Sequence, residues 1–148
     1  MAMTMNGEVQ LAAPREAVWE KLNDPAVLKV CIPGCEEFER TEDNGFRATA
    51  KMKVGPVSAR FKGKVMLSDL DPPNGYKISG EGEGGVAGFA KGGATVALAE
   101  KDGGTRLSYN VEAQIGGKLA QLGQRLINGA AKKLADEFFT NFGKAVQG

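Results

Sequence analysis

Residues 51–68 read KMKVGPVSARFKGKVMLS, and this stretch decides the fold of the chain. After a Gly-Pro turn, apolar Phe61 and Val65 alternate with charged Lys62 and Lys64. A period of two along the chain is typical of a strand with one dry face and one wet face. The stretch therefore predicts two antiparallel strands that are joined by a short turn.

The same period extends to both sides of this hairpin, with turn signals at regular intervals. The predicted strands of the meander cover residues 36–42, 46–54, 57–70, 76–84, 89–100 and 105–115. Before them come a strand at 6–12 and two short helices at 14–23 and 26–31, with proline near the helix boundaries. Long strands near the upper end of the usual range favour a strongly curved sheet.

The C-terminal segment, residues 118–146, contains no proline and predicts one long helix. Its apolar residues recur three or four positions apart, which gives one wide stripe. The stripe consists of Leu119, Leu122, Leu126, Ala130, Leu134, Phe138 and Phe142. A helix of this length needs a long partner surface. We therefore expect a single α+β domain, residues 1–148, in which a curved seven-stranded antiparallel sheet wraps around the C-terminal helix.

Glycine is distributed unevenly over the turns of the meander. Successive turns alternate between the two ends of an antiparallel sheet. The turns at 43–45, 72–75 and 102–104 contain Asn-Gly or Asp-Gly, which are typical of tight connections. The other turns are glycine-rich without this signature, and we expect them to meet at one end as the mobile gate of a cavity. The gate residues would be Gly55, Pro56, Gly84, Gly85, Gly88, Gly116 and Gly117.

Composition argues against several classes of function. The 148 residues include 19 basic and 18 acidic ones, and a net charge of +1 gives no global attraction to nucleic acid. The absence of histidine removes the commonest general base and metal ligand, and the two cysteines, Cys31 and Cys35, are too few for a metal site. No apolar run reaches the length of about 20 residues that a spanning helix needs. We expect a cytoplasmic protein with no metal site and no nucleic-acid partner.

Several segments of the chain are similar to those of a known family. They are residues 5–8 (MNGE), 14–19 (PREAVW), 22–25 (LNDP), 31–35 (CIPGC), 51–57 (KMKVGPV) and 107–109 (LSY). In these the chain resembles the carbon monoxide dehydrogenase G-subunit family, within the START and Bet v 1-like superfamily of helix-grip folds. The resemblance implies an accessory protein that helps a molybdenum hydroxylase to mature, to reach the membrane or to pass electrons to a lipophilic quinone. Family members often carry a C-terminal anchor, whereas this sequence stops at Gly148. This difference argues against membrane attachment by the chain itself, and we expect a cytoplasmic protein or one in peripheral contact with the inner face of the membrane.

A hydrophobic pocket is expected between the sheet and the C-terminal helix, because one helix leaves volume under a long curved sheet. Eleven side chains from different elements should converge there. They are Trp19, Leu28, Met52, Val54, Phe61, Val65, Phe89, Tyr109, Leu122, Leu126 and Phe138. The expected ligand is a lipid or a quinone-like molecule, with no covalently bound cofactor.

Basic side chains on the two strands of the first hairpin form either a solvated outer face or a docking surface for an acidic enzyme or lipid headgroups. They are Lys51, Lys53, Arg60, Lys62 and Lys64. Three functions stay open at this point: a non-catalytic ligand-binding protein, an assembly factor that binds only protein and has a vestigial cavity, and a cyclase-like or hydrolase-like enzyme. For the enzyme, the candidate acids are Glu36, Glu37 and Tyr109, none of which belongs to an evident acid and base pair.

Overall fold

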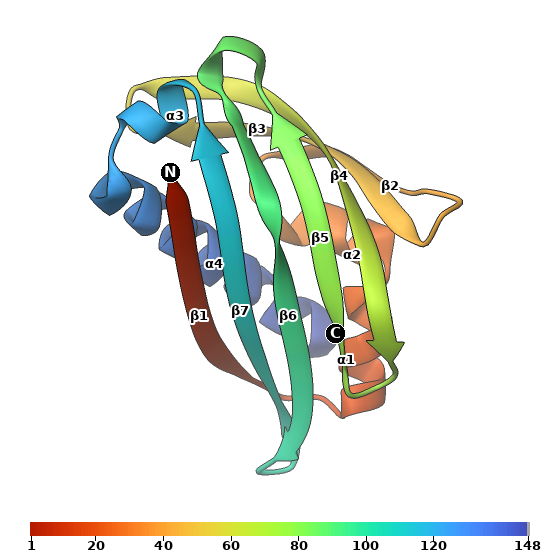
Figure 1. Ribbon diagram of the computed structural model, residues 1–148. Coiled ribbons are helices and arrows are strands. Elements are labelled where there is room, and N and C mark those ends of the chain that lie inside the picture. The colour runs from red at the N-terminus through yellow and green to blue at the C-terminus, as the bar shows by residue number, and fades with distance from the viewer. Residues whose placement is uncertain (148) are drawn as a thin grey trace.

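Seven antiparallel strands form one curved sheet in the computed structural model, which describes residues 1–147 (Figure 1). The order of the strands is β1-β7-β6-β5-β4-β3-β2, so that all neighbours except β1 and β7 are consecutive in the chain. The strands are β1 (Ala2–Leu11), β2 (Cys35–Arg40), β3 (Gly45–Val54), β4 (Val57–Asp71), β5 (Gly75–Glu83), β6 (Phe89–Lys101) and β7 (Gly104–Gly116). The helices are α1 (Arg15–Leu22), α2 (Pro25–Cys31), the short 3-10 helix η1 (Gly85–Ala87), α3 (Lys118–Gln121) and α4 (Gln124–Gln147). The expected helix-grip fold is confirmed.

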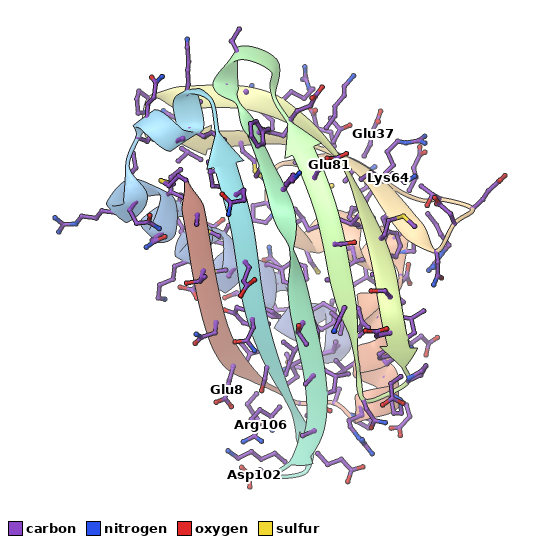
Figure 2. All side chains as sticks on the ribbon, viewed as in Figure 1. Glu8, Glu37, Lys64, Glu81, Asp102 and Arg106 are labelled. Carbon is purple, nitrogen blue, oxygen red and sulfur yellow. The ribbon has the colours of Figure 1, made fainter. Side chains whose placement is uncertain are left out.

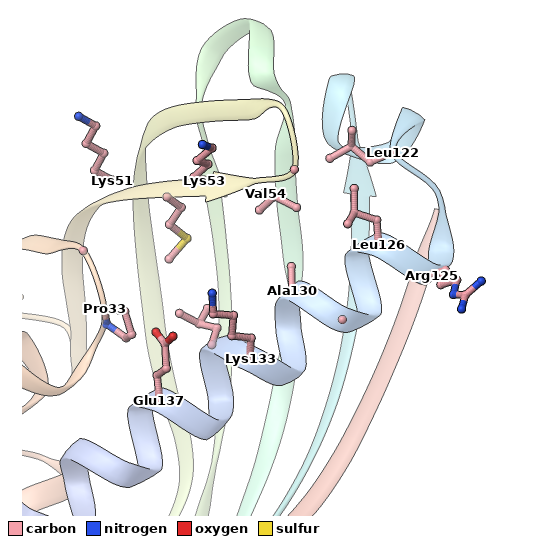
Figure 3. Close-up of a pocket in the computed structure, with 15 residues that line it drawn as sticks. Pro33, Lys51, Lys53, Val54, Leu122, Arg125, Leu126, Ala130, Lys133 and Glu137 are labelled. Carbon is pink, nitrogen blue, oxygen red and sulfur yellow. The ribbon is translucent and has the colours of Figure 1, made fainter.

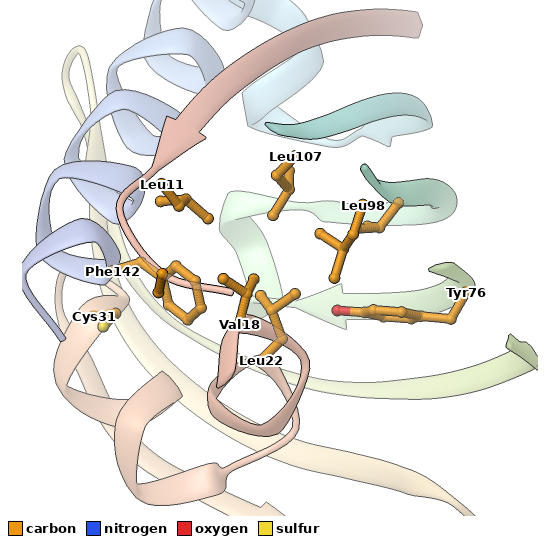
Figure 4. Close-up of a cluster of buried hydrophobic side chains, with 10 residues drawn as sticks. Leu11, Val18, Leu22, Cys31, Tyr76, Leu98, Leu107 and Phe142 are labelled. Atoms are coloured by element: carbon orange, nitrogen blue, oxygen red, sulfur yellow. The ribbon is translucent and has the colours of Figure 1, made fainter. Parts of the chain in front are cut away.

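The concave face of the sheet holds the core, and α4 lies across this face (Figure 1). One buried cluster joins α1, α2 and the C-terminal half of α4 to the sheet, and Phe142 and Val18 at its centre are completely buried (Figure 4). A second cluster, with Met3, Ile115 and Ile127, fixes the other half of α4 beside β1 and β7. The two clusters secure the helix at both ends.

The first strand begins four residues earlier than the sequence pattern predicts. β1 pairs with β7 in an unbroken antiparallel register from Ala2 opposite Gln114 to Leu11 opposite Thr105. Met3 is buried in the second cluster, and the Met1 ammonium group donates a hydrogen bond to the Ile115 carbonyl oxygen at 2.9 Å. These long-range contacts extend the strand, and no local signal marks them.

The prediction of one continuous helix over residues 118–146 is wrong at one point. Gly123 has φ +93, a left-handed conformation that ends an α-helix, and it separates α3 from α4. Pro14 likewise precedes α1 as its N-cap, with ψ 158, and does not form the first helical residue. Among residues 1–147, no helix combines the length and the apolar character needed to cross a bilayer.

Tyr76 lies in the first cluster and is 7% exposed. Burial raises the pKa of its phenol from 10.0 to about 12. The unfolded chain therefore releases this proton at lower pH than the folded chain, so stability is complete below pH 10 and falls as the pH rises toward 12. We expect a loss of roughly 2–3 kcal/mol across this range. Urea unfolding at several pH values checks this, and Tyr76→Phe should lack that part of the loss.

Candidate ligand groove

A groove of about 790 Å³ lies between β3 and the N-terminal half of α4 (Figure 3). One wall comes from Met52 and Val54 of β3, continued by Pro33 and Gly34 before β2. The other wall comes from the helical segment, where four apolar side chains follow each other at intervals of four residues. They are Leu122, Leu126, Ala130 and Leu134. The volume is in the range of about 300–1,000 Å³ that is usual for small-molecule sites.

Few polar side chains reach into the groove. Figure 3 shows Lys133 and Glu137 rising from α4 toward β3, whereas Lys51 and Lys53 point away from the helix. Among residues 1–147, the Lys133 ammonium group and the Glu137 carboxylate have no ion-pair partner within 4.0 Å. Lys133 and Glu137 thus offer the groove a hydrogen-bond donor group and an acceptor group above an apolar floor.

The groove exists because α4 crosses the sheet obliquely. Near its start, Gln124 donates a hydrogen bond from Nε2 to the Ala2 carbonyl oxygen at 3.1 Å, which holds the helix at the β1 edge. Near its end, Asn141 donates from Nδ2 to the Cys31 carbonyl oxygen at 3.0 Å, which holds it against α2. Between these two points the helix leaves the β3 side of the sheet uncovered. Leu126 remains 40% exposed as a result.

The sequence-predicted pocket residues divide into those that line this groove and those that do not. Met52, Val54, Leu122 and Leu126 line it. The other seven lie elsewhere: Trp19, Leu28, Phe61, Val65, Phe89, Tyr109 and Phe138. The ligand-binding role of the full set stays a prediction.

Three aromatic side chains among these seven pack against other aromatic rings of the core. Trp19 meets Tyr76 edge to face with ring centroids 5.3 Å apart, and Tyr109 stacks on Phe139 at 5.2 Å. Phe138 stacks on Phe142 at 5.7 Å. These rings fill the space between the sheet and the C-terminal half of α4, where the sequence predicted an open pocket.

The remaining four of the seven lie at different places, and Val65 on β4 is paired with Gly80 on β5. Leu28 is buried on α2, and Phe61 is half-buried with its ring beside Gly84. Phe89 is 46% exposed and lies over Gly116. The structure does not bring these side chains into the groove.

The glycine-rich turns do meet at one end of the sheet, as expected (Figure 1). Of the gate residues, Gly55 lines the groove, and Pro56 follows it in the β3–β4 turn. The turn after β5 is closed by a 2.9 Å hydrogen bond from the Gly84 amide to the Gly88 carbonyl oxygen. The gating role of these residues stays a prediction.

The backbone of Gly88 packs tightly against that of Gly116 and Gly117. A Cβ atom on Gly88 would lie 2.0 Å from the Gly116 carbonyl oxygen, and its φ is +116. Gly85 in the same turn also has positive φ, but a Cβ atom there would meet nothing within 4 Å. Substitutions at Gly85 and Gly88 therefore distinguish the cost of a positive φ alone from the cost of a positive φ combined with a backbone clash.

Gly88→Ala is expected to destabilise the fold by about 2 kcal/mol or more, because it adds a backbone clash to an unfavourable φ. Gly85→Ala has only the conformational cost, about 1 kcal/mol. Urea unfolding of both variants measures the difference. Equal losses of unfolding free energy in the two variants would show that the backbone around Gly88 can shift to admit a Cβ atom at no cost.

The predicted docking lysines and arginine cover the outer face of β3 and β4, where charged side chains project outward (Figure 2). Arg60 donates to Glu36 at 2.6 Å, and this hydrogen bond holds the pKa of the Glu36 carboxyl below its usual range. Lys64 pairs with Asp43 at 3.1 Å. Lys51, Lys53 and Lys62 have no such partner among residues 1–147. The stripe is therefore partly neutralised, and docking on it stays a prediction.

None of the candidate acids for an enzyme lines the groove. Glu36 is engaged with Arg60 on the outer surface, and Glu37 is exposed. The Tyr109 hydroxyl group packs against Gly7, and a Cβ atom on Gly7 would lie 2.5 Å from its oxygen. The three groups do not form a shared site.

The sequence-predicted sites leave out eight of the residues that line the groove: Pro33, Gly34, Arg125, Gly129, Ala130, Lys133, Leu134 and Glu137. A signal for this face was present, because the apolar residues from Leu122 to Leu134 keep a strict four-residue spacing. That spacing turns steadily around the helix, whose period is 3.6 residues. Apolar side chains at this spacing therefore do not all face the core, and those from Leu122 to Leu134 face the groove.

Comparisons with known proteins agree on the fold and the family. The model of the carbon monoxide dehydrogenase G-subunit (CoxG) family matches residues 7–147. A conserved protein from Geobacillus kaustophilus is 34% identical, with a TM-score of 0.92 over 98% of this chain and 95% of that one. No curated protein matches the chain.

Two more distant structures share the fold at low identity. Ara h 8.0201 is 16% identical, with a TM-score of 0.68 and 99% coverage of both chains. The ZhuI aromatase/cyclase from Streptomyces sp. R1128 is 13% identical, with a TM-score of 0.68 over 99% of this chain and 94% of that one. These two likenesses concern the fold alone. The family model, in contrast, matches nearly the whole sequence, and this match shows that the chain belongs to the carbon monoxide dehydrogenase G-subunit (CoxG) family.

Proposed function

We propose that this chain is a non-catalytic accessory protein that holds a hydrophobic small molecule, quinone-like or lipid, in the groove between β3 and α4. The observation that carries the proposal is the groove itself, in which two distant parts of the chain turn apolar side chains toward one volume. Exposed apolar surface costs free energy in water, about 25 cal/mol per Å². A bound apolar chain would cover Met52, Leu126 and Leu134.

The polar end of the ligand would lie at Lys133 and Glu137. The ammonium group can donate to a carbonyl or other oxygen, and the carboxylate can accept from a hydroxyl. Both groups lie on one face of α4, one turn apart, and neither is neutralised by an ion pair within residues 1–147. In an apolar site, a small number of well-positioned polar groups fixes the orientation of a small ligand.

The partner would be a molybdenum hydroxylase of the carbon monoxide dehydrogenase type, which this chain would serve in maturation, membrane recruitment or electron delivery. Family membership supports this role. None of Glu36, Glu37 and Tyr109 lines the groove, which favours binding over catalysis, since acid and base roles need groups that converge on one substrate. The protein would act at the cytoplasmic side of the membrane.

Native mass spectrometry and solvent extraction of gently purified protein test the proposal, together with titration of decylubiquinone and a dansyl-labelled fatty acid. We expect a lipophilic compound to be retained, or one of the probes to bind and raise the unfolding temperature. A chain that neither retains nor takes up any such compound would overturn it. A chain that captures the enzyme while binding no probe would instead be a protein-binding assembly factor.

A further inference from the structure

Large apolar side chains are exposed at the end of the sheet where the glycine-rich turns meet. We call this region the turn end and define it as residues 52–62, 82–92 and 114–126, which include the β3–β4 turn, η1, α3 and the start of α4. Val86 in η1 is 82% exposed, and Phe89 and Leu126 are 46% and 40% exposed. Figure 1 shows η1 at the extreme tip of the molecule, beyond α3.

The turn end is also strongly basic. It contains the acid Glu83 and six cations, namely Lys53, Arg60, Lys62, Lys91, Lys118 and Arg125. At the opposite end, residues 8–22, 68–77 and 99–107 hold seven acids and five cations. The net charge of +1 therefore conceals two ends of opposite sign.

Most of these cations lack an intramolecular partner. Arg60 pairs with Glu36, but among residues 1–147 no carboxylate lies within 4.0 Å of the other five charged groups. The opposite end differs: Arg15 pairs with Glu100, Lys77 with Asp69 and Arg106 with Glu8. The positive charge of the turn end thus remains available to a negatively charged surface.

We propose that the turn end docks on an anionic lipid bilayer, with Val86 inserted among the acyl chains and the five unpaired cations in contact with headgroups. An apolar tip surrounded by Lys and Arg matches such a surface on both counts. Lysine is depleted in the cores of protein–protein interfaces, which argues against an enzyme partner at this place.

Docking in this orientation would place one end of the groove beside the bilayer. Gly55, Leu122 and Leu126 belong both to the groove lining and to the turn end. The proposal concerns a surface and does not depend on the ligand, because Val86 and the lysines would hold the protein at the membrane whether or not the groove is used.

Flotation of the purified chain with lipid vesicles tests the proposal. The probes are vesicles of phosphatidylcholine alone and of phosphatidylcholine with about 30% phosphatidylglycerol. We expect binding to the anionic vesicles only, weakened by salt. Val86→Asp should lower the partition coefficient roughly tenfold or more, and so should the double change Lys118→Gln with Arg125→Gln.

Matched changes elsewhere serve as controls. Val30 on α2 is 74% exposed, so Val30→Asp makes the same substitution away from the turn end and should leave binding unchanged. The double change Lys29→Gln with Lys101→Gln removes two positive charges away from the turn end and should also leave vesicle binding unchanged. Val86→Trp should strengthen binding and shift its emission to shorter wavelength on anionic vesicles.

Any of three outcomes would overturn the proposal. The first is an absence of binding to the anionic vesicles, and the second is an equal effect of Val30→Asp and Val86→Asp. The third is loss of enzyme capture by Val86→Asp while vesicle binding persists, which would assign the turn end to a protein. Uptake of decylubiquinone from detergent micelles, measured in parallel, reports on the groove separately.

Discussion

Gly129→Phe is expected to abolish uptake of decylubiquinone or of the dansyl-labelled fatty acid while the protein stays folded. Gly129 lies on the helical wall of the groove, and a Cβ atom there would meet nothing within 4 Å. A phenyl ring can therefore grow into the groove without displacing backbone, and it would occupy the space of the ligand. The loss in affinity should exceed tenfold, since the ring and the ligand cannot share the same volume.

Gly129→Ala is the matched control for this substitution. It removes the same glycine from the same helix but leaves the groove open, so probe binding should persist. Both variants should keep or slightly raise the stability of α4, because glycine in a helix interior costs up to about 1 kcal/mol relative to alanine. Undiminished probe binding by a folded Gly129→Phe protein would show that the ligand site lies elsewhere.

Phe142→Ala is expected to lower the free energy of unfolding by about 3–5 kcal/mol. Phe142 is completely buried where α4 meets α1 and α2, and its ring stacks on Phe138. Removal of the ring loses its burial and leaves a cavity, which surrounding side chains of a close-packed core fill only in part. Urea unfolding followed by far-ultraviolet circular dichroism measures this loss.

Phe89→Ala provides the comparison at an exposed aromatic residue. Phe89 is 46% exposed, so the same change should cost about 1 kcal/mol or less. Near-equal losses for the two variants would mean that the cluster around Phe142 is not the main support of α4. Because Phe142 does not line the groove, the folded fraction of Phe142→Ala should still bind the probes.

Local patterns were sufficient to predict the strands, the helices and their order. The alternation around Phe61 and Val65 predicted β4, and Asn74-Gly75 predicted its tight connection to β5. What local patterns could not give was the early start of β1, which depends on pairing with β7 across more than a hundred residues. The break at Gly123 was a further miss, since a glycine inside an apolar repeat is compatible with a helix until tertiary packing decides.

The site was predicted less completely than the fold. Of the predicted pocket residues, the structure brings Met52 and Val54 of β3 together with Leu122 and Leu126 of the last helical segment in one groove, and their binding role stays a prediction. It could not fix the angle at which α4 crosses the sheet, and this angle decides which rings enter the core and which side chains face the groove. Trp19 and Tyr109 pack in the core for this reason, and Lys133 and Glu137 reach into the groove.

The unequal charge of the two ends of the sheet has a consequence before any contact is made. A molecule with an excess of cations at one end and of acids at the other carries an electric dipole along its strands. Near a negative surface this dipole exerts a torque, which turns the basic end forward within about 10 Å, the screening distance at moderate salt. The protein would thus be oriented during its approach, and fewer encounters would be lost to unproductive collisions.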